Sequence, residues 1–132
     1  MAASLGPGAF PPVTPGQGHG WAKLAAGVEA QVPPAEIETI YVFRPIKRDG
    51  KEWGTAVVTR KSAGPEGRLR VYTAKYMLVV RGKERGQSKV EVEEVALSPA
   101  AVLAKVMQAT VDRGGDTEPP VEFGPAVWYE GR

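Results

Sequence analysis

The sequence contains no cysteine and a single histidine, His19. Without cysteine, disulfide bonds and thiolate metal sites are excluded. His19 lies in a segment rich in glycine and proline, and a general base must be held in one orientation, so we expect no catalytic role for it. The sequence also lacks a Gly-x-Gly-x-x-Gly segment, a nucleophile elbow and a zinc-ligand pattern. These absences predict a protein that is not an enzyme and that holds no cofactor or metal.

Long hydrophobic runs are missing as well. No apolar stretch approaches the roughly 18 residues that a membrane-spanning helix needs. The first twenty residues contain neither Lys nor Arg and no continuous apolar run, which argues against a secretory signal. The absence of cysteine fits a reducing compartment. Together these features predict a cytoplasmic protein with no membrane span, and 132 residues suffice for one domain.

Glycine and proline, by contrast, are abundant at both ends of the chain. Residues 1–20 include nine of them, which predicts a flexible arm. Residues 21–35 predict a short helix and a linker, because an apolar stripe with helical spacing precedes two consecutive prolines. That stripe consists of Trp21, Leu24, Ala25 and Val28. Residues 114–132 predict an extended C-terminal tail, in which 121–129 form either an edge strand or an irregular docking segment.

Residues 36–113 between these ends predict a β-β-β-β-α domain. Asp49-Gly50 indicates a tight hairpin between residues 37–46 and 52–61, and both faces of that hairpin carry apolar side chains. A two-residue turn there pairs Ile46 with Trp53, Lys47 with Glu52, Val42 with Val57, and Glu38 with Lys61.

The second predicted hairpin joins residues 68–81 to 88–97. A loop at 83–86 places Val79 opposite Val90, Met77 opposite Val92 and Lys75 opposite Glu94. Ser98-Pro99 then starts an amphipathic helix that ends at Gly114. The predicted fold is α+β: a four-stranded antiparallel sheet of two β-hairpins followed by one amphipathic helix, with extended N- and C-terminal arms.

Charge is unevenly distributed along the chain. Residues 36–85 carry a net charge of +6 and residues 86–132 one of −4, although the whole chain carries only +2. Single-strand binders combine cationic grooves with aromatic platforms, so the basic middle is a candidate binding surface. The same residues also commonly serve as core, edge protection or solubilising groups. The candidate residues are Arg44, Lys47, Arg48, Lys51, Trp53, Arg60, Lys61, Arg68, Arg70, Tyr72, Lys83 and Arg85.

Two functions follow from these features. The sheet has more apolar surface than one C-terminal helix covers, and both arms suit contact with a partner. This predicts a non-catalytic structural or adaptor subunit of a larger assembly, docked through its arms and sheet surface onto protein partners or further copies of itself. The alternative is a single-stranded nucleic-acid-binding module that uses the basic aromatic surface; an acidic protein is a further possible partner of that surface.

Overall fold

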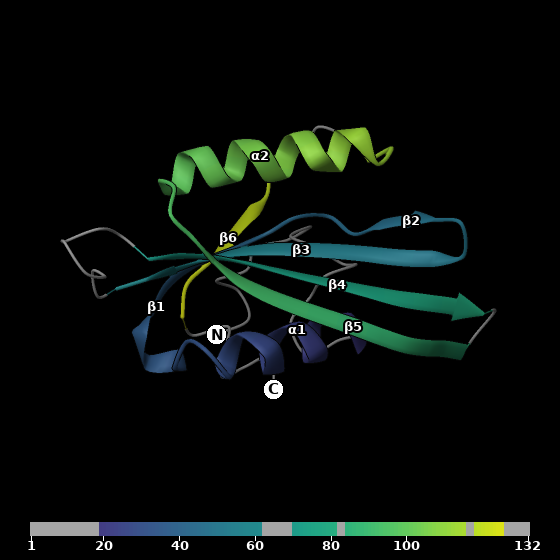
Figure 1. The fold of residues 1–132 in the computed structure, drawn as a ribbon, viewed down its shortest axis with the longest axis horizontal. Helices are drawn as coiled ribbons and strands as arrows, with labels where there is room; N and C mark the ends of the chain where they lie inside the picture. The colour runs from purple at the N-terminus through teal and green to yellow at the C-terminus, as the bar shows by residue number, and fades with distance from the viewer. Residues whose placement is uncertain (1–18, 62–69, 82–83, 116–117, 126–132) are drawn as a thin grey trace.

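The computed structural model describes residues 19–61, 70–81, 84–115 and 118–125. In this part of the chain, one antiparallel sheet lies between two helices that cover opposite faces of it (Figure 1). The strand order is β5-β4-β3-β1-β6, and β2 also pairs with β3. The elements are α1 (His19–Glu29), a short 3-10 helix (Pro34–Glu36), β1 (Ile37–Val42), β2 (Ile46–Arg48), β3 (Lys51–Arg60), β4 (Val71–Arg81), β5 (Glu84–Val95), α2 (Pro99–Asp112) and β6 (Val121–Phe123).

The α+β class and the antiparallel sheet are confirmed, but the sheet has six strands where the sequence predicted four. One additional strand arises because the first predicted strand divides into β1 and β2 around Pro45, which has no N–H for the ladder. The other is β6, which lies within the predicted C-terminal tail and forms an edge strand beside β1. Most of the predicted N-terminal arm (residues 1–18) and the end of the tail (126–132) lie outside the described residues.

The turn between β2 and β3 sets the register of the first hairpin. Asp49 and Gly50 both have positive φ, 54° and 72°, as a type I′ turn requires. The predicted pairs Ile46/Trp53 and Lys47/Glu52 are confirmed. Beyond Pro45 the predicted register is wrong by one residue, because Val42 lies opposite Ala56 and not Val57.

Farther along β1 the register shifts again, so Ile37 lies opposite Arg60 and the predicted Glu38/Lys61 pair does not form. A shift of one residue moves a side chain to the other face of a sheet. Val42 and Val57 therefore contribute to cores on opposite faces.

The predicted register of the second hairpin is also wrong, in this case by three residues. Residues 82–83 alone separate β4 from β5, so Tyr76 lies opposite Val90 and Lys75 opposite Glu91. An odd shift exchanges the faces. Val90 and Val92 accordingly pack on the α1 side of the sheet.

Both faces of the sheet are covered by helices of this chain. On one face Leu24, Ala25 and Val28 of α1 are buried, as their spacing predicted, against β4 and β5. On the other face Val102 and Val106 of α2 complete a second cluster. The expectation that part of the sheet lacks a cover within its own chain is thus corrected, because α1 supplies that cover.

Two glycines permit close packing on the α1 face. A Cβ on Gly27 would lie 2.7 Å from Cγ1 of Val90, so this glycine lets α1 approach β5. A Cβ on Gly54 would overlap the ring of Tyr76, which lies across β3 at that point. The Tyr76 hydroxyl donates a hydrogen bond of 2.9 Å to the buried carboxylate of Glu52. Neither helix of the described chain has the length and apolarity needed to cross a bilayer.

Candidate binding groove

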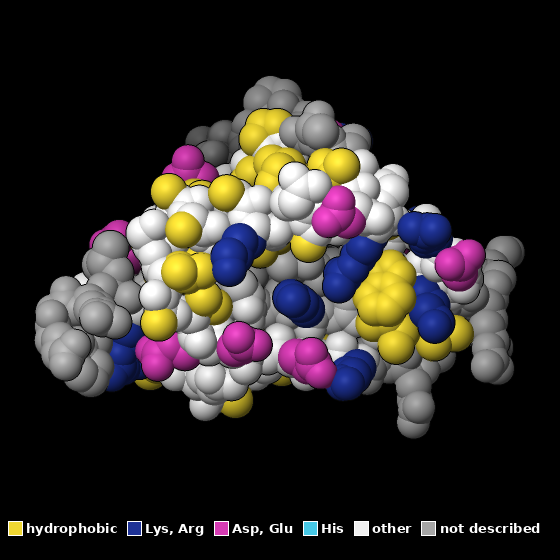
Figure 2. All heavy atoms as spheres, turned by 45° about the horizontal axis from the view of Figure 1, so that its top comes forward, with side chains coloured by type: hydrophobic (Ala, Val, Ile, Leu, Met, Phe, Trp, Pro, Cys, Tyr) yellow, Lys and Arg dark blue, Asp and Glu magenta, His cyan; other side chains and the backbone are white. Residues whose placement is uncertain are grey.

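A groove runs beside α2 on the face of the sheet that this helix covers. Helix α2 contacts β3 and β4, and the adjoining surface of β4 and β5 contains two hollows of about 330 and 300 Å³. Lys75 and Arg113 line both hollows, so the two adjoin, and we call the pair the α2 groove. Figure 2 shows Lys and Arg side chains around a hollow on this face, next to hydrophobic side chains. Its principal polar and aromatic lining residues are Trp53, Lys75, Lys89, Glu91, Glu93, Lys105 and Arg113.

The periodicity of the strands and the placement of α2 bring these charged side chains together. On a strand, alternate residues share a face, which places Lys89, Glu91 and Glu93 of β5 on the side of α2. Lys105 of α2 lies eight residues before Arg113, the C-cap residue that follows this helix, and both line the larger hollow. The groove therefore has cations on its helical wall and on its sheet wall.

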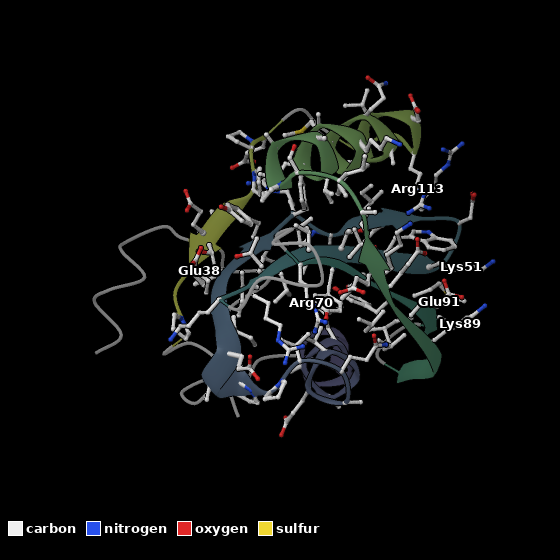
Figure 3. The ribbon with its side chains drawn as sticks, turned by 60° about the vertical axis from the view of Figure 1, so that its left-hand side comes forward. Glu38, Lys51, Arg70, Lys89, Glu91 and Arg113 are labelled. Carbon is white, nitrogen blue, oxygen red and sulfur yellow. The ribbon has the colours of Figure 1, made fainter. Side chains whose placement is uncertain are left out.

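Trp53 forms the end of the groove near the β2–β3 turn. It is half-buried, and two cations lie over its ring: Nζ of Lys51 at 5.9 Å from the ring centre and Cζ of Arg113 at 5.4 Å. These distances are within the range of cation–π attraction. Arg48 donates a hydrogen bond of 3.1 Å to the carbonyl oxygen of Arg113, which ties β2 to the end of α2. Figure 3 shows Lys51, Lys89, Glu91 and Arg113 at this same end of the sheet.

Positive charge predominates in the α2 groove. Four Lys or Arg side chains line it against two Glu, with Lys51 beside Trp53 in addition. Nζ of Lys89 lies 2.9 Å from Oε1 of Glu91. The hydrogen bond from Lys89, and then its charge and that of Lys75, lower the pKa of Glu91. An anion entering the groove would therefore meet a Glu91 charge that Lys89 already balances.

The residues of the predicted basic surface do not lie in one site. Lys51 and Trp53 lie at the α2 groove, with Arg48 beside them. Arg44 and Lys47 line a separate hollow of about 270 Å³ next to Gly114 and Gly115. Arg44 also forms an ion pair of 2.6 Å with Glu118.

The remaining predicted residues lie elsewhere. Arg60 makes two hydrogen bonds to the carboxylate of Glu36, 3.1 and 2.8 Å long, which raise the pKa of its guanidinium above the ordinary value. Tyr72 is buried in the core under α1, and Nε of Arg70 lies 3.6 Å from Glu94. Lys61 is exposed just after β3. Arg68 and Lys83 lie outside the described residues, as does the side chain of Arg85.

The predicted surface did not include four of the cations in the groove. They come from three different elements, so no single segment of sequence contains them. A partial signal was present at the predicted helix, where Lys105 precedes Arg113 by eight residues. The missed residues are Lys75, Lys89, Lys105 and Arg113.

The chemistry that the groove offers is recognition of anions and planar rings. Among the residues that the structure describes, no three His, Asp or Glu side chains lie together as a metal site would require. Comparisons with protein-family models, with curated proteins and with solved structures found no match for this chain.

Proposed function

We propose that this protein is a binding module for single-stranded nucleic acid and that the α2 groove is its binding site. The observation that carries the proposal is the presence of Trp53 and four cationic side chains in one groove. Proteins that bind single strands combine a cationic groove, which follows the phosphates, with aromatic rings on which bases stack. In this assignment Trp53 stacks on a base, and Lys75, Lys105 and Arg113 contact phosphates.

A single strand fits this groove better than a duplex does. The bases of a duplex are paired and stacked on one another, so a duplex has no free base face for Trp53. The groove is also bounded by α2 on one side and by the sheet beneath, which suits one backbone. We therefore expect weaker binding to a duplex than to either of its separated strands.

Docking as a non-catalytic subunit of a protein assembly is the second candidate. Apolar residues on both faces of the sheet no longer favour it, because α1 and α2 cover those faces. The observation that still favours it is the long edge strand β5, which borders the sheet on one side.

The first experiment measures binding directly. Fluorescence anisotropy of labelled oligothymidine and oligouridine, and of a duplex of the same length, is recorded at two salt concentrations. Because each phosphate contact to a single strand releases counterions, the three assigned contacts predict a loss of about 20-fold in affinity for a fourfold rise in salt. Failure to bind single strands at low salt contradicts the proposal.

Two substitutions with the same charge change locate the site. Lys75→Glu places a negative charge in the middle of the α2 groove, whereas Lys61→Glu does so at an exposed residue that does not line it. We expect Lys75→Glu to weaken binding by tenfold or more, on the order of one lost phosphate contact and one new repulsion, and Lys61→Glu to have a much smaller effect. Equal losses would mean that overall charge, and not the groove, attracts the ligand.

A third substitution tests the role of the aromatic ring. Trp53→Leu keeps an apolar side chain and removes the stacking platform, which predicts a loss of about tenfold in affinity. The dependence of affinity on salt should stay the same, because the phosphate contacts remain. Unchanged affinity would remove Trp53 from the site.

A further inference from the structure

We propose that two copies of this chain pair through strand β5, edge to edge and antiparallel, to form one continuous sheet. Strand β5 spans Glu84–Val95, twelve residues, and lies at the end of the strand order. In the described part of the chain, no other strand pairs with its outer side. The opposite edge differs, because β6 there is only three residues long.

An open edge of this length is unusual unless it is protected or used. Strand edges expose backbone N–H and C=O groups that readily accept another strand. Lys89, Glu91 and Glu93 are all exposed on the α2 side of β5, and Val90 and Val92 are partly buried on the α1 side. A second copy of β5 would supply the missing backbone partners without disturbing either core.

Among axes at residues 89–93, a part of β5 whose side chains the structure describes, the charges favour one register between the two copies. A twofold axis perpendicular to the sheet keeps the α2 faces of the two copies on the same side. It also places one residue of β5 opposite the same residue of the other copy. An axis at Lys89 or at Glu91 opposes two like charges. An axis at Val90 places Lys89 of each copy opposite Glu91 of the other, which forms two attractive pairs and no repulsive one.

One hydrogen bond already involves the α1 side of this strand. The amide of Gln31 donates to the carbonyl oxygen of Val92 at 3.2 Å, and this contact is exposed. A carbonyl oxygen has two lone pairs, so it can accept from Gln31 and from a strand at the same time. The contact is therefore compatible with pairing at Val90.

The same axis places both α2 grooves on one face of the joined sheet. Each Glu91 at the groove would then have Lys89 of the second copy beside it, and each Lys89 would have Glu91 of the second copy, so these pairs leave the net charge of each groove unchanged. The pairing itself does not depend on nucleic-acid binding, because it is measured on the protein alone.

The principal test exchanges the two charges. Lys89→Glu and Glu91→Lys each replace two attractions by two repulsions, which predicts dimerisation weakened by about tenfold or more. Mixing the two variants restores both attractions, so a heterodimer should form, and the double variant K89E/E91K should dimerise with itself. Sedimentation velocity at low salt over a wide range of concentration measures all five samples, wild type included.

Each result decides for or against the pairing. A wild-type chain that stays monomeric at every concentration overturns the proposal; that result is also expected if an arm of the same chain occupies the edge. A dimer that neither single substitution weakens overturns it as well. Circular dichroism of each variant verifies folding, which these exposed side chains should leave intact.

Disulfide trapping tests the register, because the chain has no cysteine of its own. Directly opposed residues have Cβ atoms about 4.5–5.5 Å apart, whereas diagonal neighbours are about 7–8 Å apart. Lys89→Cys mixed with Glu91→Cys should therefore yield mainly the mixed disulfide under mild oxidation. Equal or greater yields of the two homodisulfides would show that the axis does not pass through Val90.

Discussion

Gly54→Ala tests the packing of Tyr76 across β3. The added Cβ would overlap Cε2 and Cζ of the Tyr76 ring and lie 2.7 Å from Cδ2, so the ring must move. Tyr76 is only 7% exposed, and its hydroxyl holds the buried Glu52 carboxylate at 2.9 Å. A ring that moves far enough to accept the methyl group loses this hydrogen bond.

The expected magnitude combines three effects. Overpacking of a filled core costs about 1–3 kcal/mol. Losing a hydrogen bond to a charged group costs about 1.5–3 kcal/mol. Replacing glycine in a strand returns roughly 0.5–1 kcal/mol, because the unfolded chain becomes less flexible. We therefore expect Gly54→Ala to lower the free energy of unfolding by about 2–5 kcal/mol.

Urea denaturation monitored by circular dichroism measures this change, and the chain offers a matched control. A Cβ on Gly124 would meet no atom within 4 Å, so Gly124→Ala should change stability by less than about 0.5 kcal/mol. In a background of Tyr76→Leu the ring is absent, and Gly54→Ala should lose most of its effect. If Gly54→Ala proves as mild as Gly124→Ala, the proposed contact with Tyr76 is wrong.

Three further predictions concern α1, α2 and β5. Gly27→Ala should destabilise the fold by about 1 kcal/mol. The new Cβ would lie 2.7 Å from the stiff side chain of Val90, and the cost of this clash exceeds the roughly 1 kcal/mol that alanine gains in helix propensity. An increase in the urea midpoint would contradict this prediction. Ser98→Ala removes the cap of α2, an N–H···Oγ bond of 3.2 Å, and should cost about 1 kcal/mol in the same assay, whereas Ser98→Asp should retain stability. In an NMR titration the Glu91 carboxyl should have a pKa below 4.5, and Lys89→Ala should raise it. Because the folded-state pKa is lowered, the stabilisation from this pair is present above pH 4.5 and is lost as the pH falls through the folded-state pKa.

Local signals in the sequence predicted the elements that depend on neighbouring residues. Asp49-Gly50 set the turn and the pairs next to it, and the stripe of α1 was buried as its spacing indicated. The prediction became wrong at Pro45, where a missing N–H interrupts the ladder and shifts the register. No turn signal of similar strength marks residues 82–83, so the alternation of β5 alone could not fix its register.

Features that depend on contacts between distant segments could not be predicted from local signals. The sequence gives no reason for Val121–Phe123 to pair with β1, because the pairing depends on space left at that edge. Glycine lowers helix propensity, yet Gly27 permits the contact of α1 with Val90. The α2 groove joins residues of four elements, β3, β4, β5 and α2, so only the spacing of Lys105 and Arg113 was visible beforehand.

The pairing of β6 with β1 also bears on the order in which the sheet forms. Ile40 lies opposite Phe123, 83 positions later (123 − 40), whereas β2 and β3 are joined by a two-residue turn. Closing a long loop costs more conformational entropy than closing a short one, and distant contacts slow folding. We expect the β2–β3–β4–β5 meander to form first and β6 to join last. During synthesis on the ribosome, Phe123 also emerges after every other strand, so β1 remains an open edge until then.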